Sequence, residues 1–148
     1  MSELLKKQNY GVEVEFTGIS RKMAADAVAE IIGTTASRPD HTCYQTRTIQ
    51  DSQGRKWKVM RDSSINPIRK VGTENMDEYR VEFVTPVLKY EDLDTLQAII
   101  RKFRENQVEV FQIHPICKLV VQLVDGVGSY SGCPRQICLS KSHLPKLF

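Results

Sequence analysis

The 148-residue sequence lacks the long apolar runs of a membrane protein. No stretch reaches the ~18 consecutive apolar residues that a membrane-spanning helix needs, so we expect no membrane span. The first residues, MSELLKKQNYG, contain no apolar signal region, and secretion is therefore not expected. The four cysteines form no CxxC pair, and we interpret them as free thiols of a protein in the reducing cytoplasm.

Most of the chain also lacks an excess of one charge sign. Residues 1–110 carry 17 basic and 17 acidic side chains, whereas residues 111–148 carry four basic and one acidic. A nucleic-acid-binding protein usually has a basic face on its folded body. We therefore expect no nucleic-acid partner.

Hydrophobic periodicity predicts a strand and a helix at the start of the chain. Residues 9–17 alternate apolar and polar side chains with period two, which is typical of a half-buried strand. A helix should follow, with Ser20 as its N-cap and Gly33 ending it in a left-handed conformation. Its expected buried stripe consists of Met23, Ala27, Val28 and Ile31.

The next part of the chain predicts three further strands and one more helix. Residues 34–54 are polar and irregular, and the segment RKWKVMRDSS after them reads as the second strand, with Trp57 and Val59 on one face. The segment YRVEFVTPVL is the third strand and should stop near Pro86, which lacks an N–H for the ladder. The segment YEDLDTLQAIIRKFREN is a helix, and QVEVFQI is the fourth strand. The apolar residues that recur in this helix at steps of three or four are Leu93, Leu96, Ile100 and Phe103.

The order of the elements, strand, helix, strand, strand, helix, strand, predicts the fold class. The hairpin-like middle argues against a purely parallel sheet. We expect an α+β fold with a mostly antiparallel sheet and helices packed on one face. The opposite face of the sheet should carry the polar side chains of the strands.

Carboxylates are concentrated on that polar face. Glu13 and Glu15 point to the same side of their strand, roughly 6–7 Å apart. Glu82 could join them if its strand lies nearby. Carboxylates that converge without partners repel each other, and a hard divalent cation such as Mg²⁺ would relieve that repulsion.

Basic side chains lie in the same strand regions. Lys58, Arg61 and Arg80 beside a carboxylate-held metal would suit a triphosphate or an acyl phosphate. The simpler alternative is a solvated strand face with cross-strand ion pairs. Asp62 is likewise explained either by a turn after a strand or by a loop that contacts substrate.

Four blocks in the same order resemble the amidoligase family, which is related to glutamine synthetase and to glutamate–cysteine ligase. They are YGVEVEFTGIS, a helix ending in AEIIGT, WKVMRDSSI, and RVEFVTPVLKYEDLDTL. The resemblance covers residues 9–110 and implies a glutamine-synthetase-like sheet. It also implies an ATP- and Mg²⁺-dependent ligase that joins a carboxylate to an amine through an acyl phosphate.

The resemblance also implies roles for individual residues. Glu13 and Glu15 match the paired acidic residues on the first strand of the family, and Glu82 matches the acidic residue before the Thr-Pro pair. These three would hold Mg²⁺. The candidate catalytic residues are Lys58, Asp62 and Arg80, and the candidate ATP-binding residues are Lys58 and Arg61.

The C-terminal part departs from the family pattern. A CGxHxH stretch and a long helical half are expected after the fourth strand, but the chain has HPICKLVVQL and then few charged residues. We therefore divide it into residues 1–110, the N-terminal part of a catalytic domain, and residues 111–148. The second segment is either a divergent terminus or one translated out of register, and the sheet would then be incomplete.

Two functions follow from this sequence. One is a cytoplasmic carboxylate–amine ligase, present here as a fragment that is either active or inactive, acting on small-molecule or peptide carboxylates and amines. The other is a noncatalytic binding or scaffold domain derived from such a ligase.

Overall fold

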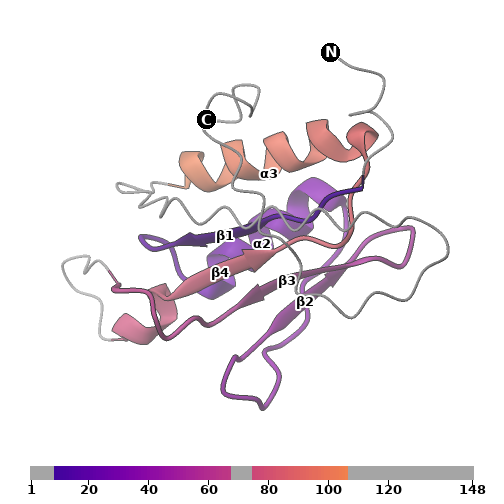
Figure 1. Cartoon of the computed structure of the whole chain (residues 1–148). Helices are drawn as coiled ribbons and strands as arrows, with labels where there is room; N and C mark the ends of the chain where they lie inside the picture. The colour runs from indigo at the N-terminus through magenta and orange to yellow at the C-terminus, as the bar shows by residue number, and fades with distance from the viewer. Residues whose placement is uncertain (1–8, 68–74, 107–148) are drawn as a thin grey trace, which may run out of the picture.

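The computed structural model describes residues 9–67 and 75–106, and these form a four-stranded antiparallel sheet with two helices (Figure 1). The strands are β1 (Glu13–Phe16), β2 (Arg47–Gln50), β3 (Lys56–Met60) and β4 (Val81–Val84). Their order in the sheet is β1-β4-β3-β2, and each neighbouring pair is antiparallel. The predicted α+β class is confirmed. The likeness to the glutamine synthetase sheet stays a prediction.

The short strand β2 was not predicted, because it falls in the segment expected to be irregular. Only Ile49 of its four residues is buried, so the hydrophobic signal is too short to show a period. Strand β2 exists because it pairs with β3, placing Ile49 opposite the buried Trp57. The strand predicted at residues 107–113 lies outside the described residues.

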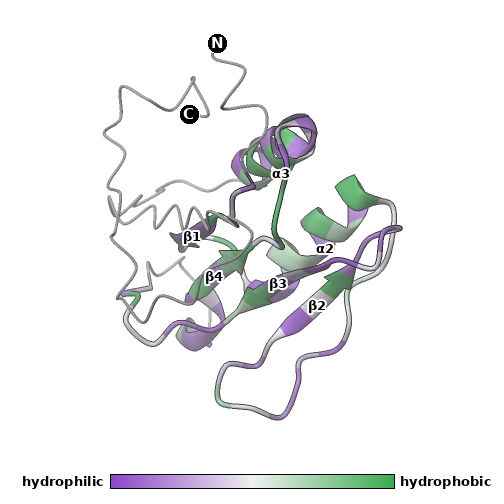
Figure 2. Cartoon of the chain, turned by 45° about the vertical axis from the view of Figure 1, so that its right-hand side comes forward, coloured by the Kyte–Doolittle hydropathy of each residue, from purple (hydrophilic) through white to green (hydrophobic). Residues whose placement is uncertain are grey.

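Both helices pack on the same side of the sheet (Figures 1 and 2). Helix α2 (Arg21–Ile32) begins after Ser20, whose Oγ accepts a hydrogen bond of 3.2 Å from the backbone N–H of Met23. It ends at Gly33, which has a φ of 80° in the left-handed region. Both predicted caps are confirmed. No helix of the described residues is long and apolar enough to cross a membrane.

The buried stripe predicted for α2 was partly wrong. Met23 is 45% exposed, while Ala27 and Val28 are buried as predicted. Ala24 and Ala25 take inward positions instead, so the side of α2 that faces the core is lined mainly by small residues. Helix length and caps follow from local sequence, but the rotation of a helix depends on what it packs against.

Helix α3 (Leu93–Glu105) covers the core with a cluster of aromatic rings. Phe103 of this helix packs against Phe16 of β1 with ring centroids 4.9 Å apart. It also meets Phe83 of β4 edge to face at 5.4 Å, and Phe83 stacks on Trp57 of β3 at 6.1 Å. Burial of such rings is a major part of the stability of a small domain. The cluster joins α3 to three strands and fixes the sheet that carries the site.

Two short 3₁₀ helices complete the described elements. The first, η1 (Met76–Tyr79), precedes β4, and the second, η2 (Tyr90–Asp92), leads directly into α3. A polar network links η2 to the turn between β2 and β3. Both terminal nitrogens of Arg55 donate to the carboxylate of Asp92, at 2.9 and 3.0 Å, and its Nε donates to Asp51 at 2.8 Å. This network ties the hairpin to the start of α3.

Candidate metal centre

The side of the sheet turned away from the helices carries the acidic residues, and we call it the carboxylate face. The strand register places Glu15 directly opposite Glu82, and Glu82 opposite Met60. A second row places Glu13 opposite Val84, and Val84 opposite Lys58. Residues directly opposite in an antiparallel pair point to the same face. The expected sharing of a face by the first and third predicted strands is therefore present.

Asp62 extends this face beyond the end of β3. It follows Met60 by two residues, and its Oδ1 accepts a hydrogen bond of 2.8 Å from the backbone N–H of Ser64. Carboxylate oxygens of Glu15, Asp62 and Glu82 all lie within 4.8 Å of one another, and the three residues are half-buried. We call these three residues the carboxylate cluster.

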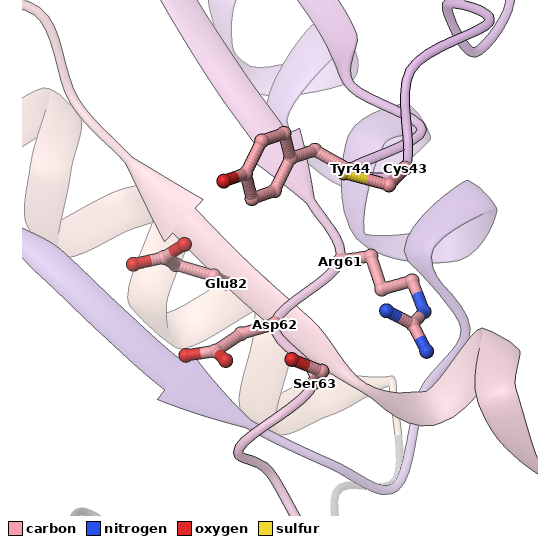
Figure 3. A pocket seen from close by; sticks show the side chains of 6 residues that line it. All are labelled: Cys43, Tyr44, Arg61, Asp62, Ser63 and Glu82. Carbon is pink, nitrogen blue, oxygen red and sulfur yellow. The ribbon is translucent and has the colours of Figure 1, made fainter.

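A pocket of about 340 Å³ opens beside the carboxylate cluster. Figure 3 shows the carboxylates of Asp62 and Glu82 side by side, with the ring of Tyr44 across from them. The guanidinium of Arg61 points away from the carboxylates in the same view. The described residues that line the pocket are Cys43, Tyr44, Arg61, Asp62, Ser63 and Glu82.

The donor set suits Mg²⁺. This ion prefers oxygen ligands at 2.0–2.1 Å in an octahedron, so two protein oxygens on it lie about 3 Å apart when adjacent and about 4 Å when opposite. The oxygens of the carboxylate cluster, which lie within 4.8 Å of one another, are close to those separations. Mg²⁺ also commonly keeps positions for water and substrate phosphates. A pocket that is open beside the cluster leaves room for both.

Comparison with protein families identifies the family of the chain. The family described as "Putative amidoligase enzyme" matches residues 6–121. The chain belongs to this amidoligase family. No curated protein and no solved structure gives a significant match to the chain. The domain boundary predicted at residue 110 lies outside the described residues and stays a prediction.

The amidoligase chain brings together a different acidic set from the predicted one. Glu15 and Glu82 belong to the carboxylate cluster, whereas Glu13 lies on the same face one row away. Asp62, predicted to contact nucleotide or substrate, takes the third place in the cluster. A signal for it was present in the sequence, since Lys58, Met60 and Asp62 continue the same period of two beyond the strand end.

Lys58 is an exposed cation on the carboxylate face of this amidoligase sheet. It lies diagonal to Glu82 across β3 and β4, at a separation of about 7–8 Å that a long side chain spans. No hydrogen bond or ion pair of its ammonium group is found within residues 9–67 and 75–106. Its position beside the cluster is compatible with the predicted contact to phosphate.

The two arginines predicted to act in the site have partners within the protein. Nε of Arg61 donates to both carboxylate oxygens of Asp77, at 2.8 and 2.9 Å. Nη1 of Arg80 donates to the backbone carbonyls of Ser63, at 2.8 Å, and Ile65. These contacts hold the loop after β3 and point both guanidinium groups at protein atoms.

Sequence reasoning overlooked Arg21 at the start of α2. Its side chain is 2% exposed, and it donates to the side chains of Gln45, at 2.6 Å, and Glu78, at 3.2 Å. It also contacts the backbone carbonyl of Asp77. An arginine in the first turn of a predicted helix gives no local sign of burial, because its partners come from loops distant in sequence.

Cys43 is free and exposed, in agreement with the prediction of free thiols. The other three cysteines lie outside the described residues. The thiol lines the pocket on the same side as Tyr44, and the backbone carbonyl of Tyr44 accepts a hydrogen bond of 2.7 Å from the N–H of Arg61. This bond joins the loop that carries Tyr44 to the segment after β3 that carries Asp62.

Proposed function

We propose that this amidoligase-family chain is an ATP-dependent carboxylate–amine ligase whose Mg²⁺ is held by Glu15, Asp62 and Glu82. The carboxylate cluster is the observation that supports this proposal most strongly. Three acidic groups from three separate segments bring carboxylate oxygens within 4.8 Å of one another beside an open pocket, where a cation would offset the repulsion between them. The family match over residues 6–121 supports the ligase class.

The proposed reaction has two steps. A carboxylate oxygen of the substrate attacks the γ-phosphorus of ATP, which gives an acyl phosphate and releases ADP. The amine nitrogen then attacks the acyl carbon, phosphate leaves with the bonding electrons, and the amine gives up a proton as the amide forms. Bound Mg²⁺ would neutralise phosphate charge during this transfer. The substrates belong to the class of small-molecule or peptide carboxylates and amines, in the cytoplasm.

The residues of the chain take distinct parts in this scheme. Glu15, Asp62 and Glu82 bind the metal and so orient the phosphates attached to it. Lys58 supplies a positive charge to phosphate oxygens from its place on the carboxylate face. Arg61 and Arg80 are bound to protein groups, so we assign them no contact with ATP.

Calorimetric titration with Mg²⁺ and ATP tests the metal site. The wild-type chain should give a binding heat that disappears in the double variant Glu15→Gln, Glu82→Gln. Glu13→Gln separates the two possible acidic sets, because it should retain binding if the carboxylate cluster is the site. Glu105→Gln changes an exposed carboxylate on α3 and is the matched control.

Two results would contradict the proposal in different ways. Unchanged binding by the double variant would remove the metal-site assignment. Binding without ADP release, over a panel of carboxylates and amines, would instead favour the noncatalytic binding domain. The bonds of Arg61 to Asp77 and of Arg80 to the loop after β3 give that second function some support, because Lys58 is then the remaining predicted cation for a phosphate group.

A further inference from the structure

The position of Asp62 in the carboxylate cluster is not set by the sheet. Glu15 and Glu82 belong to strands that pair directly, so the register fixes both. Asp62 lies two residues beyond the end of β3. A loop carboxylate needs other contacts to reach a site within a fraction of an ångström, and those contacts decide whether the cluster has three members or two.

Arg80 supplies such contacts from a position between η1 and β4. It stands immediately before β4, and its Nη1 donates to the backbone carbonyls of Ser63, at 2.8 Å, and Ile65. These two carbonyls belong to the turn that begins at Asp62. The turn is completed by the N–H of Ser64, which donates to Asp62 Oδ1 at 2.8 Å, and by the N–H of Ile65, which approaches Asp62 O at 3.4 Å.

Asp77 holds the guanidinium of Arg80 from the other side. Its Oδ1 lies 3.5 Å from Nε of Arg80 and 2.8 Å from Nε of Arg61. The buried side chain of Arg21 donates to the backbone carbonyl of Arg80 at 3.3 Å. Both the backbone and the head group of Arg80 are therefore held in place, and its Nη1 is directed at the Asp62 turn.

We propose that Arg80 is a positioning residue that places Asp62 in the carboxylate cluster, an inference that rests on the proposed function of the cluster as a Mg²⁺ site. Arg80 is not among the described residues that line the pocket. Both hydrogen bonds of Nη1 are made to loop carbonyls. Arg80 thus acts on the metal through Asp62 and not by contact with substrate.

Amide hydrogen exchange tests the positioning without any metal. In Arg80→Met, the N–H groups of Ser64 and Ile65 should exchange about fivefold faster than in the wild type, as expected for the loss of a hydrogen bond worth near 1 kcal/mol. The N–H of Phe103 in α3 should keep its rate. Arg101→Met, an exposed change on α3, is the matched control and should alter neither.

Binding of Mn²⁺, followed by electron paramagnetic resonance, tests the consequence for the metal. Arg80→Met should weaken Mn²⁺ binding at least about tenfold, as is usual when a residue that orients a metal ligand is removed. In a chain that already carries Asp62→Asn, Arg80→Met should lower the affinity for Mn²⁺ little further. Arg80→Lys keeps a donor near the carbonyls and should restore part of the affinity.

The outcomes separate the two proposals. Equal exchange at Ser64 and Ile65 in Arg80→Met and in the wild type would overturn the positioning role, and so would additive losses of Mn²⁺ affinity in the double variant. A wild-type chain that binds no Mn²⁺ would overturn the proposed function, while the exchange rates would still decide the role of Arg80. If Arg80→Met does not fold, Arg80→Lys takes its place in both measurements, with smaller changes in the same direction.

Discussion

Glu15 and Glu82 stand directly opposite each other across β1 and β4, on the face of the sheet away from the helices. Like charges in directly opposed positions destabilise a strand pair. The pairing of β1 with β4 therefore brings together two negative charges, Glu15 and Glu82, whose repulsion weakens that pairing. A cation between the two carboxylates would offset this repulsion.

Removal of one charge from this pair should therefore stabilise the chain when no metal is present. We expect Glu15→Gln to raise the free energy of unfolding by roughly 0.2–1 kcal/mol in the presence of EDTA. Urea denaturation followed by circular dichroism measures this change. With Mg²⁺ added, the wild type should become more stable than Glu15→Gln, because the wild type gains binding energy that the variant lacks. A variant less stable than the wild type in EDTA would contradict the repulsion.

The sequence predicts one part of the candidate site and not the other, for a physical reason. A period of two places Glu13 and Glu15 on one face of β1. The same period places Glu82 on the face of β4 turned away from the buried side chains of Val81 and Phe83. Local patterns determine such alternation. The choice between Glu13 and Glu15 as cluster member depends on the register of β1 against β4, which no local pattern specifies.

The period of two in Lys58, Met60 and Asp62 indicates the face on which Asp62 lies. Its place in the cluster and the partners of the arginines depend on contacts between distant segments, and no local pattern predicts these contacts. Asp62 lies in a loop whose carbonyl groups accept hydrogen bonds from Arg80. Arg61 donates to Asp77, which lies 16 residues later in the sequence. The sequence shows that these arginines are charged, but only the tertiary structure determines which groups they bind. The missed strand β2 has the same cause, since only its pairing with β3 defines it.

Arg55 is expected to be important for stability, since it bridges Asp51 and Asp92. The two side chains are 8% and 13% exposed, and loss of the guanidinium would remove hydrogen bonds from both half-buried carboxylates. We expect Arg55→Met to lower the free energy of unfolding by about 1–3 kcal/mol, the range for hydrogen-bonding groups that are left without a partner away from water. Lys22→Met breaks the exposed ion pair with Asp26 and should cost at most about 0.5 kcal/mol in the same urea titration. Equal effects of the two changes would show that the Arg55 network adds little.

The same network predicts how the chain responds to acid. Hydrogen bonds from Arg55 hold the pKa of Asp92 below its ordinary value of 3.8 against the effect of burial. Burial alone would raise the pKa of Asp51, but hydrogen bonds from Trp57 and Arg55 outweigh it and the pKa is lowered. Groups with a lowered pKa stabilise the fold above the ordinary value, and this stabilisation is lost as the pH falls below it. Urea midpoints measured from pH 5 downward should therefore fall more steeply in the wild type than in Arg55→Met, and parallel curves would contradict the assignment.

The environment of Tyr10 predicts how the stability of the chain changes at alkaline pH. Burial, with a smaller effect of the Asp92 charge, raises its pKa from 10.0 to about 12. Its hydroxyl is buried without a hydrogen-bond partner among the described residues. The unfolded chain loses this proton first as the pH rises above 10.0, so the unfolded state binds fewer protons and the stability contributed by Tyr10 is lost towards pH 12.

Urea unfolding at pH 9, 10 and 11 should show this loss of stability in the wild type and a smaller loss in Tyr10→Phe, because phenylalanine has no proton to release. Spectrophotometric titration of tyrosinate absorbance at 295 nm gives an independent check, because Tyr10→Phe should remove the component that titrates last. A Tyr10→Phe curve identical to that of the wild type would show that the ring is accessible to water in the folded chain.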